Sequence, residues 1–213
     1  TFKNFLIIAK SNLAKWNNLI DLLDDSYCVG YNTFKVIESN PAVISQNDIT
    51  ITDDSENNTI TISTANLGLG TYEYSLIDDQ GNVEFNYTNQ PSFNDVPAGI
   101  HTILIKDINC SGIPTQMEVS IIGYPKFFTP NNDGHNDTWA ILGVNETFYS
   151  NSKIYIFDRY GKFITSIKPN EVGWDGLFNG QQLPATDYWF TAELIDSTGI
   201  IRIRKGHFSL IRS

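Results

Sequence analysis

The stretch "YWFTAELIDSTGIIRIRKGHFSL", residues 188–210, carries the pattern that decides the fold class. Its ends, YWFTAEL (188–194) and RIRKGHFSL (202–210), alternate or run apolar as β-strands do. Between them, Ser197-Thr198-Gly199 is a sequence typical of a turn. The stretch therefore predicts two strands separated by a turn.

The same organisation recurs from about residue 34 onward. Five further segments are predicted strands: TITIST (59–64), YEYSL (72–76), HTILI (101–105), MEVSI (117–121) and KIYIF (153–157). Turn sequences separate them at 79–82, 97–99 and 174–176. Many short strands at such spacing are typical of β-sandwiches. We predict an all-β fold with two Ig-like β-sandwich domains in series, preceded by a short N-terminal helix.

Four segments follow from composition and local repeats. Apolar residues at helical spacing within 2–23 predict an amphipathic helix in a segment, 1–27, whose role is unknown. Residues 28–45 are a predicted closing strand of a preceding repeat, because their Cys-x-Gly spacing is echoed at Cys110. The acidic part ends near Gly123-Tyr124-Pro125, so we expect domains at 46–123 and 124–213. Equivalent positions in successive repeats lie a domain length apart, so no disulfide between Cys28 and Cys110 is expected.

The charge distribution limits the kinds of partner. Residues 1–123 hold 5 basic and 15 acidic residues, whereas residues 124–213 hold 9 of each. Nucleic-acid binding needs a basic surface, so the acidic balance argues against it. No apolar run approaches the roughly 18 residues of a membrane span, so no transmembrane segment is expected in this chain.

A basic strand closes the chain, and it has two interpretations. No acid follows Asp196, but four cations do: Arg202, Arg204, Lys205 and Arg212. Cations protect a solvated edge strand from unwanted pairing. Alternatively, a partner reads them as a recognition strand.

The sequence predicts no enzyme. It has no GxSxG, HExxH, phosphate-loop or dinucleotide motif. His101 and His207 lie inside strand patterns, where we expect a half-buried or surface histidine. Most acids lie in turns, where they hydrogen-bond their own backbone. A carboxylate pair assembled from distant strands is the remaining catalytic alternative.

The polar loop in "FFTPNNDGHNDTW", residues 127–139, has two interpretations. Calcium takes 6–8 oxygen ligands, and the loop offers candidate ligands at Asn131, Asp133, Asn136 and Asp137 around the flexible Gly134. The other interpretation is a network of Asx-turns that holds a long loop rigid. No cofactor is required in either case.

Four ordered blocks carry a family resemblance. The block YPKFFTPNNDGHNDTW (124–139) resembles the opening signature of the gliding-motility-associated C-terminal domain, the type B sorting domain of the type IX secretion system. IYIFDRYGK (154–162), WDGLFNGQQLPATDYWF (174–190) and KGHFSLIR (205–212) resemble its later blocks. The residues taken as signature positions are Phe128, Thr129, Pro130, Asn131, Asp133, Gly134, Asn136, Asp137, Trp139, Arg159, Gly161, Trp174, Asp175, Gly176, Gly180, Pro184 and Tyr188. Asn132 stands where the family usually has Gly, and Asn tolerates the positive φ that the loop needs.

This resemblance implies a non-catalytic export and surface-targeting signal. Such domains are similar to an address label that the type IX translocon and a PorP/SprF-type outer-membrane partner read in the periplasm of a Bacteroidota-type bacterium. The cargo is then secreted or displayed on the cell surface. Residues 46–123 resemble the Ig-like repeat that precedes this domain in surface adhesins, on the segment FNDVPAGIHTILIKDINCSGI (93–113). That repeat is expected to be a spacer or an adhesin module.

Several roles within the resemblance stay open. Trp139 and Trp174 are either core anchors or recognition contacts. Arg159 is expected to pair with a loop carboxylate. The alternative function is a calcium-dependent carbohydrate- or protein-binding module that uses the loop together with Trp174, Tyr188 and Trp189.

Overall fold

The computed structural model describes residues 39–53, 57–109, 112–169 and 171–212. These residues belong to one compact unit and form strands, turns and a single 3-10 helix, Gln46–Asp48. The all-β prediction is thus confirmed for the part of the chain that is described. The predicted helix at 2–23 and both cysteines lie outside it. Of the predicted closing strand 28–45, only 39–45 are described, and they contain no strand.

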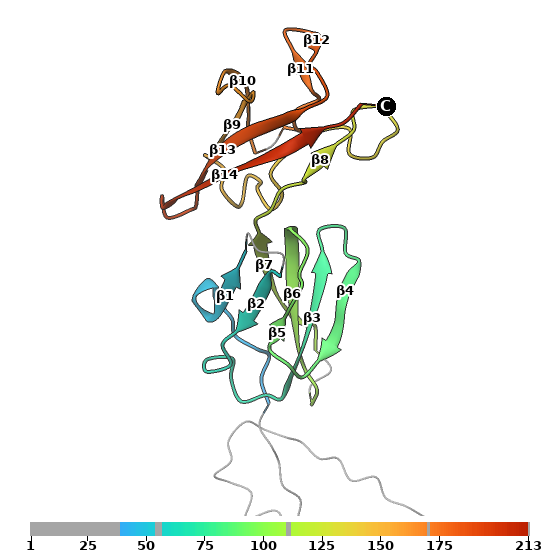
Figure 1. The fold of residues 1–213 in the computed structure, drawn as a ribbon. Helices are drawn as coiled ribbons and strands as arrows, with labels where there is room; N and C mark the ends of the chain where they lie inside the picture. Colours follow the sequence, from blue (N-terminus) through green and yellow to red (C-terminus); the bar gives the residue numbers. More distant parts are fainter. Residues whose placement is uncertain (1–38, 54–56, 110–111, 170, 213) are drawn as a thin grey trace, which may run out of the picture. The chain divides into compact units, whose positions relative to one another are not determined.

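The first sandwich is built from two antiparallel sheets (Figure 1). One has the order β1-β2-β5, with β1 Ile49–Thr52, β2 Thr59–Ile62 and β5 Ser92–Phe93. The other has the order β4-β3-β6-β7, with β4 Val83–Thr88, β3 Tyr72–Asp78, β6 Gly99–Asp107 and β7 Thr115–Ile121.

Period-two burial explains how these sheets pack. Along β6, His101, Ile103 and Ile105 are buried and alternate with half-buried residues. Ile103 and Ile105 share one core with Ile60 and Phe93 of the other sheet. Successive strand side chains point to opposite faces, so one apolar face of each sheet fills the space between them.

His101 departs from the sequence prediction. Its side chain is only 2% exposed, so the expected half-buried or surface position is wrong. The imidazole Nε2 lies 2.9 Å from the Pro97 carbonyl oxygen, and Nδ1 lies 2.7 Å from a Glu84 carboxylate oxygen. The second contact lacks hydrogen-bond geometry. The Pro97 carbonyl is therefore the one hydrogen-bond partner that the described residues give this buried ring.

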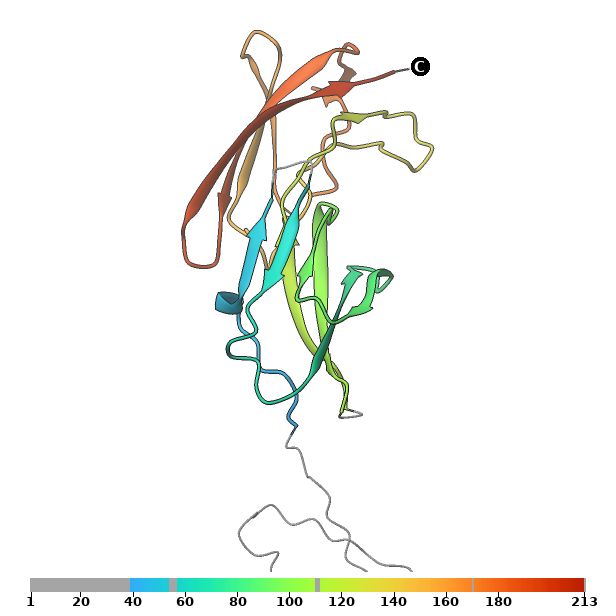
Figure 2. The same ribbon diagram turned by 60° about the horizontal axis from the view of Figure 1, so that its bottom comes forward.

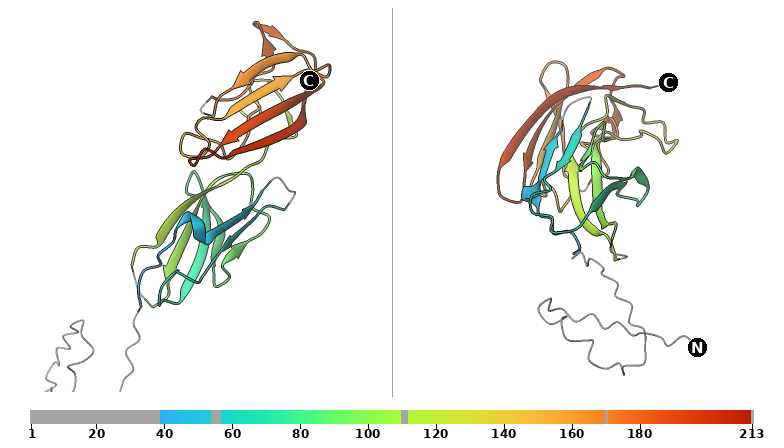
Figure 3. Two further views of the ribbon diagram at one scale, coloured as in Figure 1. Left: turned by 90° about the vertical axis from the view of Figure 1, so that its left-hand side faces the viewer. Right: turned by 90° about the horizontal axis from the view of Figure 1, so that it is seen from below.

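The second sandwich has one regular sheet in the order β10-β9-β13-β14-β8. Its strands are β10 Phe163–Ile167, β9 Lys153–Phe157, β13 Asp187–Ile195, β14 Ile201–Leu210 and β8 Phe127–Phe128. All neighbours are antiparallel except β14 and β8, which run parallel. Figures 2 and 3 show β13 and β14 as one long, twisted hairpin. The short hairpin of β11 (Leu177–Phe178) and β12 (Gln181–Gln182) lies beyond the end of this sheet (Figure 1).

Register determines which side chains of the long hairpin enter the core. Tyr188 pairs with Phe208, and Phe190 pairs with Gly206. Tyr188, Phe190 and Phe208 are at most 2% exposed, whereas Trp189, between them, is 40% exposed. The inward side chains pack with Trp139, Trp174, Ile122 and Ile141, which come from loops and isolated bridges. The second layer of this sandwich is therefore mostly loop.

All seven predicted strands are present in the structure. The chain passes from one hydrophobic core to the other between Ile121 and Ile122. Three strands of four or more residues, β1, β4 and β10, were not predicted. β1 and β4 do alternate apolar and polar residues but bury no side chain, whereas β10 does not alternate strictly.

Candidate functional site

The polar loop between Phe128 and Trp139 is held by Asp137. Its Oδ1 accepts the backbone N–H groups of Asn131 at 3.0 Å and Asn132 at 2.6 Å. Its Oδ2 accepts the N–H of Gly134 at 2.8 Å. Three donors converge on one carboxylate, which closes the loop on itself. The Thr129 N–H, directly before Pro130, donates to the Asn136 carbonyl at 2.7 Å and closes the base of the loop.

Asp133 organises the tip of the same loop. Its Oδ1 accepts the His135 N–H at 2.8 Å, and its Oδ2 accepts the Asn131 amide at 2.8 Å. The Asn131 side-chain bond, followed by the His135 backbone bond, lowers the pKa of Asp133 below its ordinary value. Hydrogen bonds to the charged form of a carboxylate favour that form.

Three positive φ angles complete the loop. Asn132 has φ 61°, Asn136 has φ 53° and Gly134 has φ 87°. Asn132 therefore takes the left-handed conformation that the usual glycine would supply, as the sequence led us to expect.

These hydrogen bonds support the Asx-turn interpretation of the loop. Each carboxylate oxygen of Asp133 and Asp137 already accepts at least one N–H donor. These donors use two of the roughly four lone-pair sites of Asp133 and three of those of Asp137, which leaves few for a calcium ion. In the described ranges, no group of three or more His, Cys, Asp or Glu side chains is placed to hold a metal ion.

The two signature tryptophans are core residues. Trp139 is 0% and Trp174 is 4% exposed, and their backbones form an isolated antiparallel bridge. The Trp139 ring stacks on Phe208 with centroids 3.9 Å apart, and its Nε1–H donates to the Pro125 carbonyl at 2.9 Å. The Trp174 Nε1–H donates to the Leu177 carbonyl at 2.8 Å. Both indoles thus join the loop layer to the sheet, and neither is available as a surface contact.

A second cluster of signature residues builds the β11–β12 hairpin and its attachment. Asp175 accepts the Leu177 N–H at 2.9 Å, and Gly180 has φ 76° in the tight turn. Gly176 has φ 79°, and an added Cβ would lie 3.0 Å from a guanidinium nitrogen of Arg212. Glycine there therefore permits both the turn and the approach of Arg212.

Tyr188 and Pro184 form the next attachment in this region. The Tyr188 hydroxyl donates to the Pro184 carbonyl at 3.0 Å. Burial raises the pKa of Tyr188 above its ordinary value. Because Trp174 and Tyr188 are both buried, the three aromatics of the alternative binding function do not share a surface. Of that set, only Trp189 faces outward.

Three of the four cations near the end of the sequence, Arg202 and Arg204 on β14 and Arg212 after it, already have partners. Arg202 forms a short ion pair, 2.5 Å, with Asp53, which directly follows β1, and also donates to the Tyr149 hydroxyl at 3.0 Å. Arg204 lies 3.4 Å from the same carboxylate. Burial acts to lower the pKa of Arg202, but the bond and charge of Asp53 outweigh it, and the pKa ends above its ordinary value. Arg212 donates to the carbonyls of Leu183 and Gly176 at 3.2 Å each.

Lys205 and Arg159 differ from those three arginines. Both are exposed, and in the described part of the chain neither forms an ion pair. Arg159 instead lies over the Tyr160 ring, 5.7 Å from its centroid. The expected pairing of Arg159 with a loop carboxylate is therefore not formed. The nearby Asp158 accepts the N–H groups of Tyr160 and Lys162, and Gly161 has φ 79° in that turn.

Comparisons with known proteins agree with this geometry. Residues 122–210 match the CHU_C Type IX secretion signal domain. The match covers the second hydrophobic core, so the resemblance carried by the four sequence blocks is confirmed there. A Type IX secretion signal domain indicates export to the cell surface or secretion. No curated protein matches the chain.

Solved structures show weaker similarity. A two-domain fibronectin type III segment of chicken tenascin is 10% identical, with 76% of this chain and 97% of that chain covered and a TM-score of 0.29. The FN1–FN3 domains of chicken CNTN1 are 11% identical, with coverages of 83% and 70% and a TM-score of 0.25. The BSP domain of a biofilm-associated protein is 14% identical at a TM-score of 0.26, and the match covers 78% of this chain but 29% of that chain. At these scores we base no functional argument on them.

Two features of the site were missed by sequence reasoning. Asp53 lies about 150 positions from the arginines that it holds, so no local pattern links them. Gly173 has φ 110°, and an added Cβ would lie 2.7 Å from the Trp139 carbonyl oxygen. Its place directly before the signature Trp174 is the one signal that could have revealed it.

Proposed function

We propose that the second sandwich is a non-catalytic export and surface-targeting signal for type IX secretion. The observation that carries the proposal is the match of residues 122–210 to the Type IX secretion signal domain, on a sandwich with its own hydrophobic core. A signal of this kind is read as a folded object, so it needs a rigid surface. The network around Asp137 and the stacked pair Trp139–Phe208 give the loop layer that rigidity.

The machinery that reads the domain is proposed to include the type IX translocon and a PorP/SprF-type outer-membrane protein. The first sandwich is proposed to act as a spacer or adhesin module. Its core is fully formed and separate from the second one, which suits a passive module in a chain of domains. No cofactor is proposed for either role. Among the described residues, no helix has the length and apolarity needed to cross a bilayer.

Localisation of a reporter tests the export function. A fluorescent protein with a periplasmic leader is fused to the complete chain, and a matched fusion ends at Ile121, where the first core ends. Both are expressed in a host with type IX secretion and in a strain of that host without it. We expect surface or medium signal only for the complete chain in the competent host. Periplasmic retention of the complete chain in that host would refute the proposal.

The fusion that ends at Ile121 is a better control than a chain from which only the basic strand is removed. Deleting residues 202–213 would remove β14 together with Phe208 and Leu210, which are 0% and 2% exposed. Such a truncation would unfold the second core, so a loss of export would say nothing about recognition.

A further inference from the structure

The outer face of the five-stranded sheet carries a row of aromatic rings. Phe163, Phe157, Trp189 and His207 lie on β10, β9, β13 and β14 and are joined by register pairs from each strand to the next. Neighbouring strands are about 4.8 Å apart, so the row extends roughly 14 Å across the sheet. Ring centroids are 6.1 Å apart for Phe157 and Phe163 and 6.0 Å apart for Trp189 and His207.

This face is apolar beyond what the fold requires. Phe163 is 50%, Ile201 58% and Ile203 57% exposed, although the opposite face of the same sheet already supplies the core. The solvated face of an antiparallel sheet is normally polar. Exposed apolar patches of this kind mark interaction sites.

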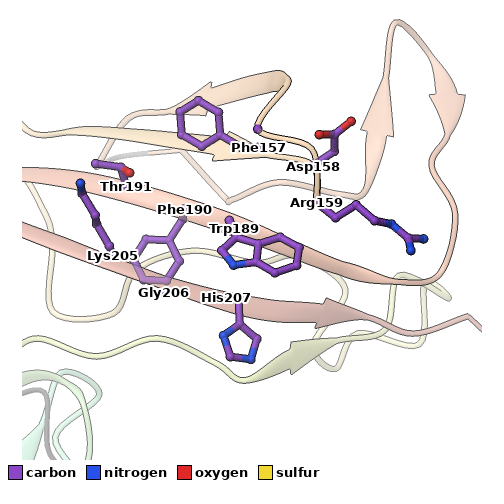
Figure 4. Close-up of a pocket in the computed structure, with 10 residues that line it drawn as sticks. Phe157, Asp158, Arg159, Trp189, Phe190, Thr191, Lys205, Gly206 and His207 are labelled. Carbon is purple, nitrogen blue, oxygen red and sulfur yellow. The ribbon is translucent and has the colours of Figure 1, made fainter.

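Two cations that form no ion pair with any described residue lie at the rim of the aromatic row. Trp189, Phe157, Arg159 and Lys205 line one open hollow of about 520 Å³. Figure 4 shows the indole of Trp189 beside the imidazole of His207, with Arg159 on the adjoining turn. The one carboxylate in the hollow, Asp158, accepts two backbone N–H groups and is committed to its turn. The lining of the hollow holds this one carboxylate against two cations, so its formal net charge is positive.

The other candidate recognition features are occupied. Trp139 and Trp174 are buried, and the carboxylates of the polar loop accept backbone donors. Arg202 and Arg204 are held by Asp53, and Arg212 is held by two carbonyls. The outer face, by contrast, combines exposed aromatic rings with two cations that have no ion-pair partner among the described residues.

We propose that this outer face is the surface through which the signal domain is recognised, and that its partner is a protein surface with an apolar centre and carboxylates at its rim. Trp and Arg are the residues most enriched among the energetic centres of protein interfaces. Lys205 and Arg159 would form charge-assisted hydrogen bonds with the partner's carboxylates. The inference rests on the proposed export function and names the surface that performs it.

The test uses the complete chain fused to the reporter, with two variants of the outer face. One is Phe163→Ser with Trp189→Ser, and the other is Arg159→Glu with Lys205→Glu. Matched controls change exposed residues of the same sandwich outside this face: Val172→Ser, at 85% exposure, and Lys168→Glu. Melting of each purified chain verifies folding. The charge reversals touch no core residue, so they test the face even if the apolar pair destabilises the sheet.

We expect export to fall about tenfold or more in both outer-face variants and to be unchanged in both controls. Normal export of the folded charge-reversal variant would overturn the inference while leaving the export function intact. Normal export of both variants, together with binding of an insoluble polysaccharide that Trp189→Ser abolishes, would also overturn it and make the face a glycan platform. Retention of the unaltered chain would refute the export function itself.

Discussion

Replacing Asp137 with alanine tests whether the polar loop is a structural clamp. The substitution removes the acceptor of three backbone N–H groups, at 3.0, 2.6 and 2.8 Å. Of these three donors in the described loop, the Asn131 N–H also donates to the Thr129 carbonyl at 2.8 Å, so the loss falls mainly on Asn132 and Gly134. The loop joins β8 to the Trp139–Trp174 bridge, so its loosening should reach the core.

The magnitude follows from the number of bonds and their exposure. A net hydrogen bond contributes about 1 kcal/mol to stability, and a bond to a charged acceptor contributes more. Water can hydrogen-bond the freed N–H groups of this exposed loop and recover part of the loss. We therefore expect the free energy of unfolding to fall by about 2 kcal/mol in total. For a domain of this size, each kcal/mol lowers the Tm by about 4–8 °C, so the expected fall is about 8–16 °C.

Tryptophan fluorescence is the suitable assay. Three of the four tryptophans, Trp139, Trp174 and Trp189, lie in the second sandwich, so the signal reports mainly on its unfolding. Two matched variants grade the effect. Asp137→Asn keeps one oxygen as the acceptor for two donors but turns its amide nitrogen towards the Gly134 N–H. This variant should lose about half as much stability as Asp137→Ala. Asp175→Ala removes a single bond, to Leu177, and should lose less. Equal melting of Asp137→Ala and the unaltered chain would refute the clamp.

Three further predictions concern the same sandwich. Gly173→Ala should destabilise it by about 1–3 kcal/mol in urea unfolding, because its Cβ would lie 2.7 Å from the Trp139 carbonyl at φ 110°, whereas Gly180→Ala, with open space around it, should cost less. A larger loss at Gly180 would contradict this steric explanation. Millimolar calcium should leave the Tm unchanged, since the loop carboxylates already accept N–H donors, and a calcium-dependent rise reversed by a chelator would restore the metal interpretation. Hydrogen bonds from side chains and from the backbone lower the pKa values of Asp133 and Asp196 from 3.8. The stability that these two carboxylates contribute is therefore present above pH 3.8 and is lost as the pH falls through their folded-state pKa values. Melting near pH 7 and near pH 3 should therefore show acid destabilisation that Asp133→Asn reduces, and an equal pH dependence in that variant would contradict the assignment.

The class of the fold and the family of its second half were readable in the sequence. Period-two alternation in segments such as 101–105 and 188–194 is a local property, because each strand side chain points opposite to its neighbour whatever the strand pairs with. The positive φ at Asn132 was also local, since it depends on a turn a few residues long. The motif blocks were recognisable in the sequence for the same reason, because each one forms a turn or a buried contact near its own position.

Long-range placement decided the rest. Trp189 and Trp139 are equally large and apolar in the sequence, but only the assembled layers bury Trp139 against Phe208 and leave Trp189 on the open face. Arg202, Arg204 and Lys205 lie close together in the sequence. Asp53, far away in the sequence, forms ion pairs with the two arginines and not with Lys205. The aromatic row exists only because strand register aligns residues from four separate strands. Pairing between distant segments sets these neighbours, and no local pattern encodes it.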